Sequence, residues 1–133
     1  MTVRQINPES LGAPRGYANG LLCDDGKLLF IAGQIGWNER QEIVSQDFVE
    51  QFDRALANVL VVVAAAGANA NHIARMVIYV TRKNEYKERQ REVGERYRRH
   101  MGQHYPAMVL VEVKSLLDDN AKVEIEAIAV IPV

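Results

Sequence analysis

Two carboxylates near the C-terminus are the residues best suited to acid–base chemistry. Glu124 and Glu126 alternate with apolar residues in the segment 123–129, and this alternation favours a β-strand. Side chains two positions apart in a strand lie on one face, about 7 Å apart along the chain. A carboxylate in a partly buried cleft can move a proton to and from water, so Glu124 is the candidate catalytic residue. The alternative is that one or both carboxylates form ion pairs between subunits.

Four residues of the N-terminal third are candidates for ligand contact: Arg15, Tyr17, Gln34 and Trp37. Tyr17 could stack on a planar ligand or donate a hydrogen bond, although a tyrosine at the start of a strand is also ordinary sheet packing. Trp37 is the only tryptophan and follows the glycine-containing segment 33–36, where the backbone can approach a ligand closely. It could cover the same cleft as Glu124 or lie in a seam between subunits. A solvent-exposed position is the alternative for Arg15.

Other kinds of active site have little support in this sequence. Cys23 is the single cysteine, so an intrachain disulfide or a paired-thiol metal site is excluded. The three histidines lack the spacing of a metal site: His72, His100 and His104. We therefore expect no metal site.

The charge balance argues against nucleic acid and membranes as partners. Sixteen Lys and Arg against seventeen Asp and Glu give a net charge of −1. The basic run 96–100 is accounted for by the favourable placement of cations in the last turn of a helix. The N-terminus lacks the apolar core of a secretory signal, and no apolar run is long enough to span a membrane. A cytoplasmic protein is the expectation.

The 133 residues predict one domain, 1–133, with the element order β-β-α-β-α-β-β. The expected elements are a hairpin of 17–23 and 27–33 around Asp24-Asp25-Gly26, a helix over 45–66, a strand over 73–81, a helix over 84–101, and strands over 107–113 and 121–131. The element order predicts an α+β layer, with two helices on one face of a mixed sheet. The first helix should cover the sheet with an apolar stripe of seven residues at helical spacing: Phe48, Phe52, Ala55, Leu56, Val59, Leu60 and Val63. The other face keeps apolar side chains, which favours oligomerisation.

The helix ends are marked by specific residues. Ser45 or Asp47 can cap the first helix, and Gly67 can end it in a left-handed conformation. Asn84 is expected to cap the second helix, and Gly102 to end it.

Several segments together resemble the RidA/YjgF family along nearly the whole chain. They are 14–20, 32–35, 58–60, 65–67, the stretch Tyr-Pro-Ala-Met-Val-Leu-Val-Glu-Val at 105–113, and Val-Glu-Ile-Glu-Ala-Ile-Ala at 123–129. The resemblance implies a chorismate-mutase-like fold and a homotrimer with a central barrel and a ligand cleft at each subunit interface. It also implies hydrolysis of reactive imines and enamines to keto acids and ammonia, without cofactor or metal.

By the same resemblance, Glu124 matches the glutamate near the attacking water, and Tyr17 matches a tyrosine that lines the cleft. Leu110 matches a position whose backbone helps to hold that water. Met108 matches an arginine that binds the substrate carboxylate, and a thioether offers neither charge nor paired donors. Loss of that contact should weaken binding of small imino acids by about 2–5 kcal/mol.

Two arginines are candidates to replace the missing cation. Arg15 lies two residues before Tyr17, and Arg91 falls where the family often has a cleft-lining asparagine. Arg91 is also spaced to pair with Glu88 on a helix surface.

The sequence is compatible with three functions. The first is hydrolysis of an enamine or imine other than the simple amino-acid-derived ones. The second is a non-catalytic trimer that binds a small metabolite or serves as an interaction platform. The third is a ribonuclease, because some family members were labelled so, but the sequence shows no His/Lys pair for phosphodiester cleavage.

Overall fold

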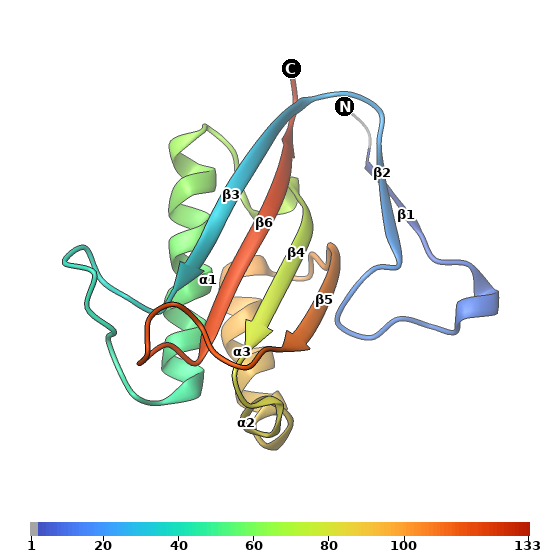
Figure 1. Cartoon of the computed structure of the whole chain (residues 1–133). Helices are drawn as coiled ribbons and strands as arrows, with labels where there is room; N and C mark the ends of the chain where they lie inside the picture. Colours follow the sequence, from blue (N-terminus) through green and yellow to red (C-terminus); the bar gives the residue numbers. More distant parts are fainter. Residues whose placement is uncertain (1–2) are drawn as a thin grey trace.

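The structure, a computed structural model that describes residues 3–133, is built on a four-stranded mixed sheet (Figure 1). The strand order is β3 (Lys27–Ile35), β6 (Val123–Ile131), β4 (Ile73–Val80) and β5 (Ala107–Glu112). β6 pairs antiparallel with both β3 and β4, whereas β4 and β5 run parallel. The mixed sheet predicted from the sequence is confirmed, and the last strand lies in its interior.

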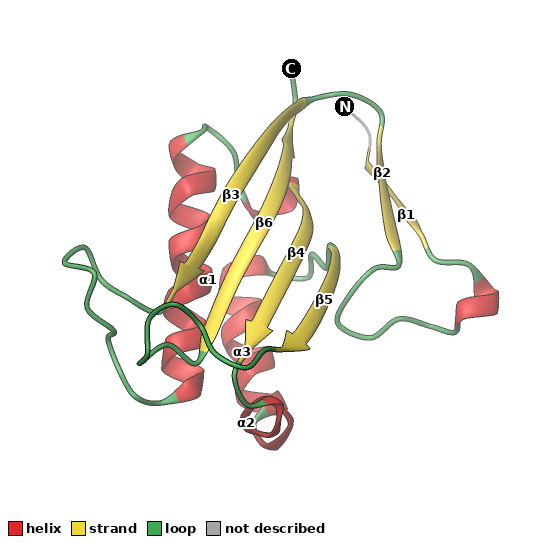
Figure 2. Cartoon of the chain, viewed as in Figure 1, coloured by secondary structure: helices red, strands yellow, loops and turns green. Residues whose placement is uncertain are grey.

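Two long helices cover one face of this sheet, as predicted (Figure 2). They are α1 (Phe48–Ala65) and α3 (Gln90–Met101), and the short α2 (Lys83–Glu88) precedes α3. The predicted second helix is therefore divided at Arg89, which has φ −126° and ψ 28°. The expected cap at Asn84 is wrong, because the helix already begins at the residue before it. Short 3-10 turns lie at Glu9–Leu11 and Ala70–His72.

The core fills the space between the sheet and the helices. The apolar stripe predicted for the first helix faces the sheet, and six of its seven members are fully buried: Phe48, Phe52, Ala55, Leu56, Val59 and Val63. Alternate residues of β4 and β6 meet this stripe, among them Met76 and Ile125, each 0% exposed. None of the helices within residues 3–133 has the length and apolar character needed to cross a bilayer.

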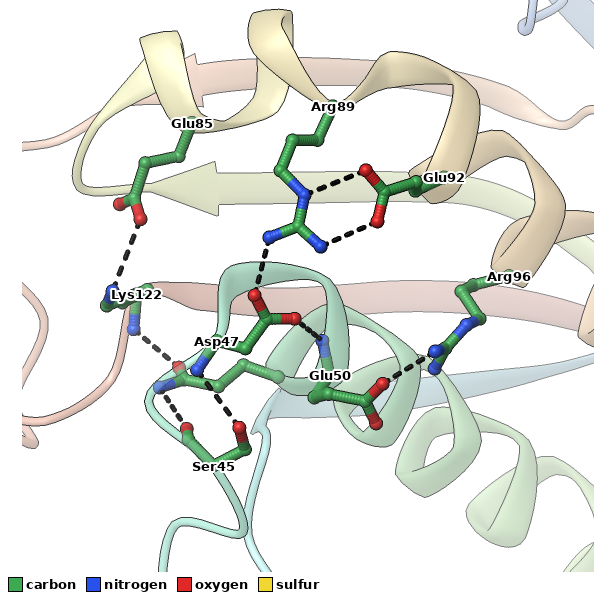
Figure 3. Close-up of polar contacts among 9 residues, drawn as sticks. Ser45, Asp47, Glu50, Glu85, Arg89, Glu92, Arg96 and Lys122 are labelled. Atoms are coloured by element: carbon green, nitrogen blue, oxygen red, sulfur yellow. Dashed lines mark hydrogen bonds and ion pairs between the residues drawn. The ribbon is translucent and has the colours of Figure 1, made fainter.

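Asp47 ties the start of α1 to the start of α3 (Figure 3). Its carboxylate accepts a hydrogen bond from the backbone N–H of Glu50, 3.1 Å away, which confirms Asp47 as the cap. The same carboxylate pairs with the guanidinium of Arg89, which also bonds Glu92. The hydrogen bond from Arg89 holds the pKa of Asp47 below its ordinary value.

Asp47→Ala should lower the free energy of unfolding by about 1–2 kcal/mol at neutral pH, because it removes both the cap and the partner of Arg89. Asp47→Asn keeps an acceptor for the cap but loses the charge, so it should cost less. Since the pKa of Asp47 is depressed in the folded state, the charge-dependent part is fully present above about pH 4 and is lost as pH falls through the folded pKa. Urea denaturation across this pH range measures both effects. If the difference in free energy of unfolding between wild type and Asp47→Asn persisted in acid, it would not arise from the charge of Asp47.

The N-terminal arm forms its own two-stranded sheet of β1 (Val3–Ile6) and β2 (Gly20–Cys23), apart from the main sheet (Figure 1). The predicted hairpin of 17–23 with 27–33 is therefore wrong. A type I′ turn needs positive φ at both central residues. Within residues 3–133, Gln41 is the one non-glycine residue with positive φ, so Asp25 does not adopt that turn. β1 was missed because its four residues are all exposed and carry no alternation.

The arm returns to the main sheet at the beginning of β5. Ala18 forms a parallel bridge with Ala107, and its N–H donates a 3.0 Å hydrogen bond to the carbonyl oxygen of Pro106. Ala18 is only 2% exposed. The arm therefore contributes backbone to the surroundings of β5.

The sheet face opposite the helices carries no covering layer within the described residues (Figure 2). Phe30 and Leu28 of the edge strand β3 are 70% and 62% exposed. Val109 and Val111 of β5, the other edge, are also exposed. The expectation that two helices protect only one face is confirmed.

Candidate functional site

Glu124 lies on the open face of the sheet, over the irregular part of β3. The register of β3 against β6 shifts between Ile31 and Gln34, and Gly33 lies within this bulge. A Cβ atom on Gly33 would stand 2.4 Å from Oε2 of Glu124. Any other residue at position 33 would displace the carboxylate, so Gly33 leaves the room that the Glu124 carboxylate occupies.

A cavity of about 420 Å³ opens beside this carboxylate. Its lining residues are Gly33, Ile35, Trp37, Leu117, Asp118 and Glu124, and we call it the Glu124 cavity. The side-chain amide of Asn58 holds its wall by donating to the carbonyl oxygens of Ile35 and Trp37, at 3.0 and 2.9 Å. The structure thus brings Glu124 and Trp37 together in a cavity whose described lining includes two carboxylates and no cationic side chain.

Glu126 lies on the same face but has a different environment. Its carboxylate accepts a hydrogen bond from the hydroxyl of Tyr79, and this bond raises the pKa of Tyr79. With Arg75 and Tyr79 it lines a separate hollow of about 160 Å³. Glu126 therefore has a structural partner within its own chain and does not line the Glu124 cavity.

Met108 lies on the opposite face of the sheet. It pairs in register with the buried Met76 of β4 and packs against the core beneath the helices. A cavity of about 260 Å³ adjoins it, which we call the Met108 cavity. Its lining residues are Gly16, Phe52, Ile78, Tyr86, Gln90, Val93, Gly94, Tyr97, Arg98, Tyr105 and Met108. Within one chain, Glu124 and Met108 therefore cannot contact the same small ligand.

The remaining candidates from the sequence line neither of the two cavities. Tyr17 is 38% exposed, and Arg15 is exposed; neither lines either cavity, although Gly16 between them does. Leu110 packs against the core. The amide of Gln34 donates to the carbonyl oxygen of Ala32 at 3.1 Å, so it is used locally.

Arg91, the other arginine that the sequence offered as a carboxylate-binding candidate, is exposed on α3 and lines neither cavity. The arginine that does line the Met108 cavity is Arg98, which the sequence reasoning missed. Two basic residues near it have partners, since Arg96 bonds Glu50 and His100 bonds Asp53 (Arg96 and Glu50 in Figure 3). The signal that could have found Arg98 is Gly94, a helix-weakening residue four positions earlier on α3.

Residues 3–133 contain no group of three or more His, Cys, Asp or Glu side chains arranged to hold a metal ion. The polar groups that line the two cavities are two carboxylates, an indole, a guanidinium, tyrosine hydroxyls and an amide.

Comparison with known proteins identifies relatives across nearly the entire chain. Residues 9–131 match the family model described as Endoribonuclease L-PSP. Protein DfrA from Myxococcus xanthus is 35% identical over 124 residues, which cover 92% of this chain and 88% of DfrA. The human 2-iminobutanoate/2-iminopropanoate deaminase is 27% identical over 120 residues, covering 90% of this chain and 82% of that enzyme.

Solved structures show the same fold. YyfB of the Rid protein family from Yersinia pestis superposes with a TM-score of 0.87 at 30% identity, covering 98% of this chain and all of that one. TdcF from Escherichia coli, solved with bound serine, superposes with a TM-score of 0.69 at 33% identity, covering 90% of this chain and 91% of TdcF. The mixed α+β architecture and the family match agree. The chain belongs to the RidA/YjgF family, the family of the Endoribonuclease L-PSP model.

Proposed function

We propose that this protein hydrolyses an imine or enamine to a carbonyl compound and ammonia, with Glu124 as the proton-transfer residue. The observation that carries the proposal is the placement of the Glu124 carboxylate. It lies over Gly33, in a cavity shared with Trp37 on an otherwise uncovered sheet face.

The reaction needs a positioned water and two proton transfers. Water adds to the carbon of the C=N bond while a base accepts one of its protons, and the nitrogen must be protonated before it leaves as ammonia. A single carboxylate can accept the proton from water and return it to the nitrogen, as general base and then general acid. The balance is one imine plus one water giving one carbonyl compound plus one ammonia.

The complete site is proposed to lie between subunits of a homotrimer. The Glu124 and Met108 cavities occupy opposite sheet faces of one chain, so a second copy must supply one of them. The exposed Phe30, Leu28, Val109 and Val111 give the open face the apolar surface that such an interface needs. In this arrangement the Glu124 cavity of one subunit faces the Met108 cavity of its neighbour.

The relatives support a small nitrogen-containing metabolite as substrate. The human relative is a deaminase of 2-iminobutanoate and 2-iminopropanoate, and TdcF was solved with serine. At position 108 a methionine cannot bind a carboxylate as an arginine does. We therefore propose that the simplest imino acids are not the preferred substrates of this protein.

The test is a turnover assay on the wild-type protein. An amino-acid oxidase generates 2-imino acids from alanine, leucine and phenylalanine in the presence of semicarbazide, which traps the imine that remains. The protein should reduce trapping of the imines with larger side chains more than that of 2-iminopropanoate. No effect on any imine, combined with binding of the corresponding keto acids, would contradict hydrolysis and favour a metabolite-binding trimer. Light scattering during size-exclusion chromatography checks the trimer.

A further inference from the structure

We infer that Arg98 is the anion-binding residue of the Met108 cavity and that this cavity takes a carboxylate with a sizeable apolar side chain. The inference deepens the proposed function by assigning a substrate class, and in that respect rests on it. The binding of a carboxylate at Arg98 can nevertheless be tested without turnover.

Among the described residues, Arg98 is the one cation that lines the Met108 cavity. Within residues 3–133 its exposed side chain makes no hydrogen bond or ion pair, whereas Arg96 is bound to Glu50 and His100 to Asp53. A guanidinium presents several N–H donors in a planar fork that matches a carboxylate. Arg98 therefore has its full donor capacity available at the wall of a cavity.

Gly94 sets the path of the Arg98 side chain. Helical side chains lean toward the N-terminus, so Arg98 extends over the residue one turn earlier. A Cβ atom on Gly94 would lie 3.1 Å from Nη1 of Arg98, closer than an ordinary contact. Glycine inside a helix is unfavourable. Its presence here lets the guanidinium lie close against α3, next to the cavity.

The rest of the cavity favours an apolar body over a second charge. Phe52, Ile78, Val93 and Met108 are apolar, and the lining contains no second charged group. The rings of Tyr97 and Tyr105 stack with centroids 5.2 Å apart and an interplanar angle of 7°. The hydroxyl of Tyr97 is fixed by its 2.6 Å bond to the carbonyl oxygen of His104. One cation beside an apolar and aromatic wall is complementary to a monocarboxylate with a branched or aromatic side chain.

Met108 adds to the preference of the cavity for a large apolar side chain. A thioether is flexible and polarisable and contacts apolar and aromatic groups favourably. A three-carbon imino acid has too little apolar surface to gain from this wall while its carboxylate is at Arg98. A ligand with a larger side chain gains binding free energy from both the apolar wall and the contact of its carboxylate with Arg98. A methionine at position 108 and a carboxylate site at Arg98 thus favour the same substrates, those with larger apolar side chains.

The experiment measures binding of two stable probes of the same shape, 3-phenylpropanoate and 3-phenylpropanamide, by calorimetry on the full-length protein. Wild type should bind the carboxylate about tenfold more tightly than the amide, and added salt should narrow the difference. Arg98→Gln should remove the preference, and Arg98→Lys should restore part of it. Arg99→Gln, a change at the adjacent exposed arginine, is the matched control and should retain it.

Gly94→Ala is a second test, in which thermal stability should rise while the affinity for the carboxylate falls. It should raise the thermal unfolding midpoint, because alanine favours the helix, and weaken carboxylate binding, because the Arg98 guanidinium must shift. Equal binding of carboxylate and amide by wild type, or an unchanged preference in Arg98→Gln, would overturn the inference. So would an Arg98→Gln protein with altered oligomeric state and unchanged binding, since Arg98 would then serve an interface.

The outcomes separate this inference from the proposed function. Arg98-dependent binding without hydrolysis of any imine supports the anion site and contradicts the deaminase. Hydrolysis that is unchanged in Arg98→Gln for every imino acid supports the deaminase and overturns the role of Arg98.

Discussion

Glu124→Gln is expected to lower the rate of imine hydrolysis by about 10²- to 10⁴-fold, the usual contribution of a positioned acid–base group. Glutamine keeps the size of the side chain and its contact with Gly33 but cannot accept a proton from water. The substitution removes no hydrogen bond or ion pair within residues 3–133, because Glu124 makes none there. The free energy of unfolding should therefore stay near that of wild type. Steady-state assays of the preferred imine, with denaturation as a stability check, measure the two effects.

Glu126→Gln is the matched control for this prediction. Both residues lie on the same face of β6, two positions apart, but Glu126 is bonded to Tyr79 and lines a different hollow. Its substitution should change turnover by no more than a few-fold. Equal losses in the two variants would indicate a general electrostatic effect of the sheet face and contradict a specific role for Glu124.

Gln51→Leu is expected to lower the free energy of unfolding by about 3–5 kcal/mol, because it leaves buried backbone groups without partners. Gln51 is 0% exposed. Its amide nitrogen donates to the carbonyl oxygens of Ser45 and Asn120, at 2.8 and 3.1 Å, and its amide oxygen accepts from the N–H of Lys122 at 2.8 Å. One side chain thereby joins the segment before α1 to the segment before β6, and leucine satisfies none of these groups.

Urea denaturation of Gln51→Leu beside Gln46→Leu measures this effect. Gln46 is an exposed glutamine five residues earlier, so its change should stay within about 0.5 kcal/mol of wild type. A loss below about 1 kcal/mol in Gln51→Leu would show that water can replace the amide, contrary to its complete burial.

The sequence predicted those parts of the fold that depend on periodicity. The stripe of α1, its cap at Asp47 and the left-handed Gly67 are local features, and the structure confirms them. The hairpin prediction failed because a favourable Asp-Gly pair does not decide which strand is the partner. β2 pairs with β1, whereas β3 pairs with β6, about 100 residues later in the chain. Gln51 was missed for the same reason, since two of its three partners lie 69 and 71 residues away.

In the candidate site too, local features could be predicted from the sequence and long-range contacts could not. That Glu124 and Glu126 share a face follows from strand alternation, but only Gly33 and Trp37 distinguish their environments. The separation of Glu124 from Met108 depends on the orientation of two strands that are not neighbours in the sheet. Arg98 lies 10 residues before Met108 in sequence, and it lines the Met108 cavity because α3 packs on the sheet. No local sequence pattern predicts that packing.

The exposed edge of β3 affects how readily a subunit outside an oligomer aggregates. β3 is nine residues long, lies at the border of the sheet, and exposes Leu28 and Phe30. Unprotected borders of this kind recruit other strands and seed aggregates. In the proposed trimer, a dissociated subunit would therefore be prone to aggregation through this edge. Slow dissociation of that trimer would then protect the solubility of the protein as well as the proposed site.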